Sequence, residues 1–426
     1  MHHQLFAEHA LLPGGWARDV LLQWNAQGQW QAMAAGQAAP PEVPRTAGPV
    51  LPGMPNLHSH AFQRALAGLT EYRSHAQDSF WSWRQLMYRF AAQLGPAQLE
   101  AIATGLYVDM LEAGYTSVCE FHYLHHDAHG QAYADPAEMS HSLLRAAQRT
   151  GIGMTLLPVL YQNSGFGGGA PTAGQSRFIH STEAMLRLFE RLQPACDAQS
   201  ARLGLAPHSL RAVTPESLRE VLTGLKALDA SAPIHIHIAE QTAEVDACVA
   251  WSGQRPVAWL LDHAPVDARW CLVHATHMDA HEYQRAAASG AVAGLCPSTE
   301  ANLGDGIFEF KTWQNHQGAW GIGSDSHIAV NPAEDLMLLE YSQRLSLRQR
   351  NVAAHAQQPD VAQALWQGAV AGGAQAAARP VAGLAVGQQA DFIVLDAQHP
   401  ALAGLSPEKL LDSVVFASCL IMAVRQ

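Results

Sequence analysis

Eight short apolar runs recur along this chain, separated by longer segments with helical periodicity, and this alternation limits the possible folds more than any other feature. The apolar runs occupy residues 50–57, 116–123, 153–161, 202–208, 234–239, 270–274, 291–296 and 318–324. The helix-like segments occupy residues 97–112, 137–149, 182–192, 216–229, 242–251, 280–289 and 333–345. Because consecutive parallel strands need a crossover connection, this alternation indicates a parallel sheet of the α/β class. Eight such units predict a (β/α)8 or TIM barrel, which takes roughly 250 residues.

The two ends of the chain differ from its middle. Residues 1–50 and 380–426 carry Gly- and Pro-rich turns and short apolar runs such as 392–395. At 426 residues the chain is long enough for one barrel and one small additional domain. We therefore expect a small β-sandwich domain formed by both chain ends, residues 1–50 and 380–426, beside a barrel over residues 51–379.

Composition excludes several classes of partner. The net charge is −12 with only 25 Lys and Arg residues, whereas nucleic-acid binding rests on basic surfaces. No apolar run approaches the roughly 18 residues that span a bilayer, and residues 1–10 lack the pattern of a secretory signal. The six cysteines form no Cys-x-x-Cys pair, which argues against a disulfide framework. We expect a cytoplasmic protein with reduced, mostly buried thiols that binds neither nucleic acid nor a membrane.

Histidines stand at the ends of the predicted strands. The chain has 23 of them, and His58 and His60 end the first run. Because residues two apart in a strand point to the same side, both imidazoles can face one ion. His237 lies near the end of the fifth run, His274 ends the sixth and Asp325 follows the eighth. Barrel enzymes place their catalytic groups at these carboxyl-terminal strand ends.

These side chains form a candidate zinc site. A catalytic zinc ion takes protein nitrogen and oxygen ligands and keeps one position for water. His235 has the same parity as His237, so spacing alone does not choose between them, and the other interpretation of His235 is a packed, hydrogen-bonded barrel residue. His274 is a possible further ligand. The ligand set that we predict is His58, His60, His237 and Asp325.

This arrangement resembles the amidohydrolase superfamily, in which a His-x-His pair follows the first strand, single histidines follow the fifth and sixth, and an Asp follows the eighth. With a further likeness at 383–391, the resemblance covers nearly the whole chain. Glu240, three residues after His237, is similar to the proton-transfer glutamate of the deaminating members. Two-metal members use a carboxylated lysine. The resemblance implies one zinc ion per chain, since none of the three lysines ends the fourth run: Lys226, Lys311 and Lys409.

Four segments resemble the formimidoylglutamate deiminase family in particular, namely residues 56–64, 120–123, 206–211 and 296–304. Arginine pairs with carboxylates through a planar fork, and an acidic protein needs such local cations for a dicarboxylate. For Arg84, which lies in an aromatic stretch, the alternative is a solvated residue on an amphipathic helix face. By this resemblance the substrate-binding residues are Gln63, Arg84, Tyr123, His208 and Arg211.

The same resemblance implies a reaction. It is the hydrolysis of N-formimino-L-glutamate to N-formyl-L-glutamate and ammonia, a step of histidine degradation, carried out by a homodimer. Glu240 is expected to help ammonia leave. Asp325 or His274 is expected to accept the proton of the attacking water, and the sequence does not rank these two.

Two other functions are compatible with the sequence. A deaminase of a nucleobase or nucleoside shares the metal site and Glu240 but needs a stacking pocket instead of two arginines. A non-catalytic barrel scaffold needs neither metal nor activity. The Gly-rich run 165–170 loosely fits a dinucleotide-binding pattern, but Pro171 follows where a helix should begin, so we expect a flexible loop there.

Overall fold

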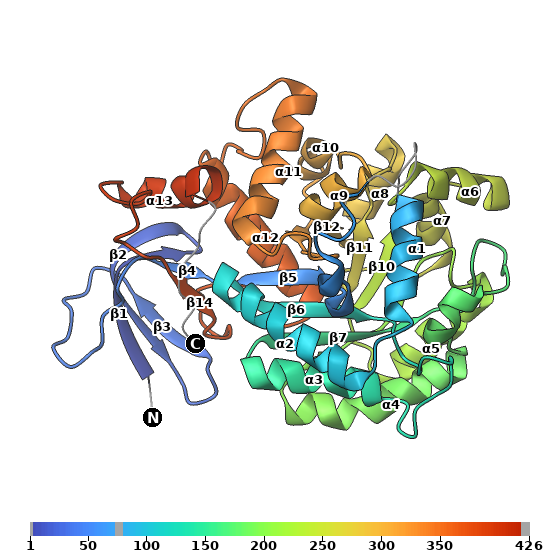
Figure 1. Ribbon diagram of the computed structural model, residues 1–426. Coiled ribbons are helices and arrows are strands. Elements are labelled where there is room, and N and C mark those ends of the chain that lie inside the picture. Colours follow the sequence, from blue (N-terminus) through green and yellow to red (C-terminus); the bar gives the residue numbers. More distant parts are fainter. Residues whose placement is uncertain (1–2, 73–79, 419–426) are drawn as a thin grey trace.

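All eight predicted barrel strands are present in the computed structural model, which describes residues 3–72 and 80–418 (Figure 1). Neighbouring strands pair in parallel. The fourth run is divided into two very short strands. The barrel strands are β5 (Met54–Ser59), β6 (Tyr115–His122), β7 (Gly153–Leu160), β8 (Arg202–Leu203) with β9 (Ala206–Pro207), β10 (Ile234–Ile238), β11 (Trp270–His274), β12 (Val292–Leu295) and β13 (Trp320–Ile322).

Two backbone bridges close these strands into a barrel. Hydrogen bonding joins β5, β6, β7, β8 and β9 into one sheet and β10 to β13 into another. Leu205 is bridged to Ile234 and Ser59 is bridged to Asp325, both in parallel. The first bridge joins β8 and β9 to β10, and the second joins the end of β13 to β5. The predicted TIM barrel is therefore confirmed.

Helices surround the barrel, and all seven segments predicted from periodicity are helical (Figure 1). Thr214 and Asn331 each cap a helix whose first residue is proline, by accepting a hydrogen bond from a backbone amide of the first turn. The surrounding helices are α2 (Pro96–Ala113), α3 (Glu138–Thr150), α4 (Thr182–Ala198), α5 (Pro215–Leu228), α6 (Thr242–Ser252), α7 (Pro256–His263), α8 (Ala280–Ala288), α9 (Pro297–Leu303), α10 (Phe310–Asn315) and α11 (Pro332–Leu347).

Helix α12 (Val361–Ala377) covers the amino-terminal end of the barrel strands. The carbonyl oxygens of Ala376 and Ala377 accept hydrogen bonds from His235 Nε2 at 2.8 Å and Thr155 Oγ1 at 2.7 Å, near the starts of β10 and β7. A Cβ at Gly372 would collide with the backbone of Trp320, so glycine is required for this close approach. Helix α12 therefore packs against the base of the barrel, opposite the carboxyl-terminal ends of the strands.

Both ends of the chain contribute to a second, mixed sheet beside the barrel (Figure 1). Its strand order is β14-β4-β1-β2-β3, and its core includes the packed rings of Trp24, Trp30 and Phe392. The run 50–57, expected as one strand, divides at Gly53, because its first part pairs with β1 and β14. The strands are β1 (His3–Leu12), β2 (Gly15–Trp24), β3 (Trp30–Ala34), β4 (Val50–Pro52) and β14 (Phe392–Val394).

Other expectations concern segments away from the strands. Residues 165–170 form turns and irregular structure after β7, as expected for a loop. Five cysteines are free and buried, and Cys419 lies outside the described residues.

Among the helices of residues 3–72 and 80–418, none has both the length and the apolar composition of a membrane-spanning segment. The remaining helical elements are η1 (Ala61–Leu66), α1 (Phe80–Ala91), η2 (Ala173–Phe178), α13 (Pro407–Ser413) and η3 (Val414–Ser418).

Candidate active site

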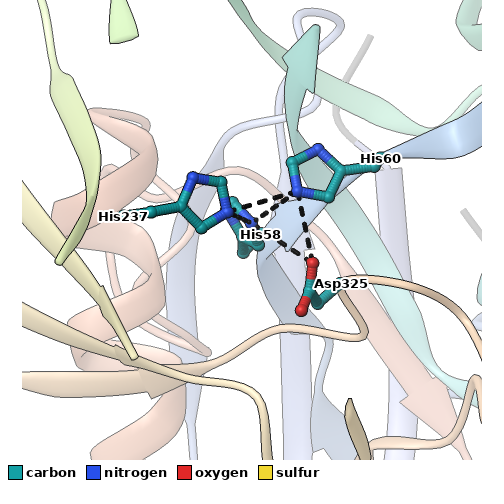
Figure 2. A group of neighbouring side chains, drawn as sticks. All are labelled: His58, His60, His237 and Asp325. Carbon is teal, nitrogen blue, oxygen red and sulfur yellow. Dashed lines mark hydrogen bonds and ion pairs between the residues drawn. The ribbon is translucent and has the colours of Figure 1, made fainter. Parts of the chain in front are cut away.

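Three histidines and one aspartate converge at the carboxyl-terminal end of the barrel (Figure 2). The Nε2 atoms of His58 and His60 are 3.1 Å apart, and His237 Nε2 lies 3.0 and 3.3 Å from them. Asp325 Oδ1 lies 3.4 Å from His58 Nε2 and 3.3 Å from His60 Nε2. A tetrahedral ion with ligands at 2.0 to 2.2 Å separates its ligand atoms by about 3.3 to 3.6 Å. The spacing therefore fits a single metal ion.

The hydrogen bonds behind these rings fix which nitrogen faces the cluster. His60 Nδ1 lies 2.9 Å from the carbonyl oxygen of Phe121, and His237 Nδ1 lies 3.2 Å from that of His208. A carbonyl only accepts, so both Nδ1 atoms carry the proton and both Nε2 atoms present a lone pair. Lone pairs that face one another at about 3 Å repel, and a cation between them removes this repulsion. The residues present thus fit a metal ion.

The protonation states also suit metal binding. Burial, with added repulsion among the imidazoles, lowers the pKa of His58 to about 3 and lowers the pKa of His60 and His237 as well. Burial alone would raise the pKa of Asp325, but its hydrogen bond to His58 and the neighbouring histidines lower it below its usual range. At neutral pH the cluster therefore offers neutral imidazoles and an ionised carboxylate, the forms that bind metal.

The structure separates His235 from His237, which spacing left equivalent. His237 belongs to the metal cluster. His235 precedes it by two residues on β10, is fully buried nearer the base of the barrel, and donates a hydrogen bond from Nε2 to the carbonyl oxygen of Ala376. His235 is therefore the packed, hydrogen-bonded residue that was its alternative interpretation. His274 lies beside the cluster but outside the four-residue group, and its Nε2 is 3.8 Å from Asp325 Oδ2.

Glu240 and His274 form a second, proton-handling part of the site. His274 Nε2 is 3.8 Å from Glu240 Oε1, and both side chains are almost fully buried. Burial raises the pKa of Glu240, with further repulsion from Glu244 and Asp325. Burial alone would lower the pKa of His274, but the nearby carboxylates outweigh it and raise this pKa. The raised pKa of Glu240, about 7, suits proton transfer near neutral pH, whereas the raised pKa of His274 keeps its imidazole protonated there.

Several backbone conformations around the site are unusual. Ala239, His274 and Asp325 follow or end barrel strands with φ values of 50°, 65° and 48°. Residues other than glycine rarely adopt this left-handed region, and each case costs on the order of 1 to 3 kcal/mol. The surrounding barrel holds these turns, which aim the side chains at the strand ends toward one point.

One pocket gathers the candidate residues around the cluster. Its wall includes every residue predicted to bind substrate or move protons, and His60, His237 and Asp325 lie at its floor, with His58 buried beneath. The aromatic side chains Phe80, Trp83, Tyr88, Tyr161 and Phe178 complete the wall. The residues predicted to bind substrate are Gln63, Arg84, Tyr123, His208 and Arg211.

The polar wall of the pocket is partly preorganised. Gln63 Nε2 donates to the Tyr123 hydroxyl at 2.8 Å, while Gln63 Oε1 has no hydrogen-bond partner. His208 Nδ1 lies 3.1 Å from Ser209 Oγ, and burial, with repulsion from Arg211, lowers the pKa of His208 so that it stays neutral. These groups offer neutral donors and acceptors to a bound molecule.

Two arginines give the pocket positive charge. Their Cζ atoms flank the ring of Trp81, Arg84 at 4.5 Å and Arg211 at 5.9 Å from its centroid. Arg84 extends from α1 into the pocket, so it differs from the alternative of a solvated arginine on an outer helix face. Its Nε has no hydrogen-bond partner. The pocket can therefore hold an anionic molecule close to the metal cluster.

Two buried carboxylates beside the site, Glu244 and Glu300, are not among the residues predicted from the sequence. Glu300 Oε1 lies 3.2 Å from His274 Nδ1. Glu244 Oε2 accepts a hydrogen bond from the backbone amide of Glu240 at 3.2 Å, and its Oε1 is 3.8 Å from Arg211 Nε. Two features of the sequence could have indicated these residues. Glu300 lies within the segment 296–304 that resembles the deiminases, and Glu244 follows Glu240 by four residues.

Comparison with known proteins agrees with this geometry. The model of the amidohydrolase family matches residues 50–419, and the model described as the formimidoylglutamate deiminase HutF N-terminal domain matches residues 2–45. The chain is 54% identical over 413 residues to formimidoylglutamate deiminase of Pseudomonas aeruginosa, covering 97% of this chain and 90% of that protein. It is also 29% identical over 363 residues to 8-oxoguanine deaminase of the same organism, covering 83% and 76%.

A solved structure is similar over almost its whole length. The crystal structure of an amidohydrolase from Brucella melitensis superposes with a TM-score of 0.94 at 49% sequence identity, covering 99% of this chain and 93% of that one. Both the barrel and the terminal sheet are thus common to the two proteins. This chain belongs to the amidohydrolase family and, within it, to the formimidoylglutamate deiminases.

Proposed function

We propose that this protein hydrolyses N-formimino-L-glutamate to N-formyl-L-glutamate and ammonia, with one zinc ion per chain. The observation that carries the proposal is that one pocket contains the metal cluster, the buried Glu240 and two arginines. Family membership supports a hydrolase acting on the C–N bond of a linear amidine.

The donor set supports zinc. Three imidazole nitrogens and one carboxylate oxygen, with separations of 3.0 to 3.4 Å between them, suit a Zn²⁺ site at which water would also bind. The three lysines lie on α5, α10 and α13, away from the strand ends, so no lysine is available to bridge a second ion in the manner of two-metal relatives. A zinc ion supplies Lewis acidity there, which makes water acidic enough to act as a nucleophile near neutral pH.

The side chains around the cluster divide the proton transfers. Asp325 Oδ2 takes up the proton that water loses as its oxygen bonds to the formimino carbon, and His274 Nε2, 3.8 Å away and kept protonated by its raised pKa, stabilises that carboxylate and shares in the proton transfer. Glu240 binds the imino nitrogen and delivers a proton to it, because its raised pKa allows it to carry one near neutral pH. The resulting amino group then takes the proton that Asp325 holds, and Glu240 regains a proton from the hydroxyl group on the tetrahedral carbon. The C–N bond breaks, ammonia leaves, and the carbon keeps the new oxygen as a formyl group.

The pocket's charge supports a dicarboxylate. Arg84 and Arg211 can each receive one carboxylate of the glutamate part through two N–H donors. Gln63 and the Tyr123 hydroxyl, already hydrogen-bonded to each other, can receive the formimino group or a carboxylate oxygen. Arg84 is half-buried and its Nε has no hydrogen-bond partner, so a substrate carboxylate beside it would satisfy a donor and favour an anionic molecule.

Steady-state ammonia release tests the proposal. Purified protein is assayed on N-formimino-L-glutamate and on its aspartate analogue, with the metal content measured on the same sample. We expect turnover of the glutamate compound, a much lower kcat/KM for the shorter analogue, and about one zinc per chain. A metal-loaded sample that releases no ammonia from either compound contradicts the proposal.

A nucleobase deaminase is the second candidate, since aromatic rings line the pocket and a relative at 29% identity carries the name of a purine-base deaminase. Two of those aromatic side chains, Phe80 and Tyr88, have ring centroids within 5.9 Å of Arg84 Cζ, so they contact a cation as well as form the wall. Guanine, cytosine and 8-oxoguanine are therefore assayed beside the formimino compounds, and activity on a base alone favours this candidate.

A further inference from the structure

Glu300 lies directly behind His274, on the side away from the pocket. It stands in the short helix α9 (Pro297–Leu303) that follows β12, whereas His274 ends β11. Its Oε1 lies 3.2 Å from His274 Nδ1 and accepts a hydrogen bond from the backbone amide of Cys296 at 2.9 Å. Both side chains are buried, with 6% and 1% of their residue surfaces exposed. A charged carboxylate is costly to bury, so this placement needs a reason.

The two nitrogens of His274 therefore face different partners. Since Glu300 Oε1 already accepts from the amide of Cys296, the proton shared with His274 is held on Nδ1, which leaves Nε2 directed into the pocket. There Nε2 lies 3.8 Å from both Glu240 Oε1 and Asp325 Oδ2. A rotation of the ring about χ2 would break the contact with Glu300 and move Nε2 away from both carboxylates.

A second metal ion is the other arrangement these atoms allow, because His274, Cys296 and Glu300 lie close enough together to bind one. Two observations disfavour a second metal ion. The oxygen that would bind the ion is already occupied by an amide and an imidazole hydrogen bond. The Cys296 thiol is fully buried, and a thiolate is the form that binds metal. A hydrogen bond between the Glu300 carboxylate and the His274 imidazole explains why these side chains lie close together, without a second ion.

We propose that Glu300 is a positioning residue for the hydrolysis: its carboxylate holds the His274 ring by Nδ1–H, so that Nε2 stays between Glu240 and Asp325. This inference rests on the proposed function for its kinetic consequence only. Groups that orient an active-site histidine in this way typically contribute 10- to 100-fold to activity. The effect should appear in kcat, because the ring position matters to proton transfer and Glu300 does not face the substrate.

Four variants test the proposal kinetically. Glu300→Ala should lower kcat about 10- to 100-fold without changing KM or metal content. Glu300→Gln keeps a carbonyl oxygen in place and should recover most of the lost kcat. In the His274→Gln background, adding Glu300→Ala should cost nothing further, because a residue that acts only through His274 has no effect once the imidazole is gone. Additive losses in the double variant overturn the proposal.

Glu340→Gln is the matched control for losing a buried carboxylate. Glu340 is fully buried on α11 and accepts hydrogen bonds from the amides of Val352 and Ala353, outside the pocket. This variant should lower thermal stability and leave kcat unchanged. If Glu300→Ala loses stability but keeps kcat, as the control does, its role is purely structural and the proposal fails.

A spectroscopic readout is independent of the substrate. Long-range ¹H–¹⁵N spectra of histidine-labelled protein, assigned with His274→Gln, should show His274 Nδ1 protonated in the wild type and a changed or mixed state in Glu300→Ala. The same state in both proteins overturns the inference even if N-formimino-L-glutamate is not the substrate. Metal analysis completes the test, since two ions per chain, one of them lost in Cys296→Ala, would favour the second metal site.

Discussion

The backbone amide of Asp325 donates a hydrogen bond to the carbonyl oxygen of His58 at 3.0 Å, where the last barrel strand meets the first. In return, the amide of His60 donates to the carbonyl oxygen of Asp325 at 3.2 Å. The residues that gather round the proposed metal ion are therefore also the residues that close the barrel. Metal binding by their side chains and hydrogen bonding between their backbones should therefore stabilise each other.

Metal removal should accordingly lower stability as well as activity. Without the ion, the Nε2 lone pairs of His60 and His237 face each other at 3.3 Å, and the Asp325 carboxylate stays buried beside the His58 ring. An ion present at about 1,000 times its Kd stabilises the native state by roughly 4 kcal/mol. We expect chelation to lower the melting temperature by several degrees in differential scanning calorimetry, and added zinc to restore it.

Heat treatment of a chelated sample without zinc serves as the control for irreversible damage. Metal-free protein that melts at the same temperature as the loaded protein would show that the cluster contributes nothing to closing the barrel.

Glu240→Gln should lower kcat by about 10²-fold or more while zinc remains bound. The amide keeps the shape and a hydrogen bond but cannot deliver a proton to the leaving nitrogen, and a positioned proton-transfer group contributes about 10² to 10⁴. Glu240 lies outside the four-residue metal cluster, so the metal content should not change. Steady-state ammonia release and metal analysis on one preparation give both values, and near-normal turnover contradicts the role.

The sequence predicts the barrel and the metal cluster for the same physical reason. Apolar runs show where strands are buried, and strand periodicity then makes His58 and His60 point to one side. Parity alone also allows His235, because it shares the inward side with His237. Only the depth of each residue in the closed barrel separates them, and depth depends on contacts with α12, which comes more than a hundred residues later.

Other parts depend on contacts that leave no local pattern. Helix α12 is buried on most of its surface and rich in alanine and glycine, and it lies outside the seven segments predicted from helical periodicity. Glu300 approaches His274 from a short helix after a different strand, and nothing in the spacing of the two residues predicts that contact. The homodimer and the cytoplasmic location stay predictions.

Arg84→Ala should reduce kcat/KM for N-formimino-L-glutamate about 10- to 100-fold. A hydrogen bond to a charged group contributes roughly 1.5 to 3 kcal/mol, and the guanidinium can donate two parallel N–H hydrogen bonds to one carboxylate. Arg84→Lys keeps the charge but loses that fork, so it should recover only part of the loss. Arg89→Ala is the matched control, because Arg89 is an exposed arginine of the same helix.

Equal kinetic effects of Arg84→Ala and Arg89→Ala would mean that general attraction by positive charge, and not a specific contact, accounts for binding. Raising the ionic strength separates the two, since screening weakens attraction between exposed charges more than contacts in a buried pocket.

Stability should fall between about pH 4 and pH 7 because of Asp335, a buried carboxyl away from the pocket. Burial raises its pKa to about 7, although hydrogen bonds from the Ser298 amide and the Tyr115 hydroxyl partly oppose this. In the unfolded chain an Asp titrates near 3.9. Between these values the native state keeps a proton that the unfolded state has lost, so the free energy of unfolding decreases as pH rises.

Asp335→Asn should remove this dependence, because the amide stays neutral at every pH. Its free energy of unfolding relative to the wild type should therefore rise with pH, by up to about 1.4 kcal/mol per pH unit within the window. Urea unfolding of both proteins at pH 5, 6, 7 and 8, with the same zinc concentration, measures the difference. Titration of groups that the two proteins share, the metal-cluster residues included, cancels in that difference. A difference that stays constant across the four pH values would mean that Asp335 is already ionised in the native protein and that its two hydrogen bonds outweigh its burial.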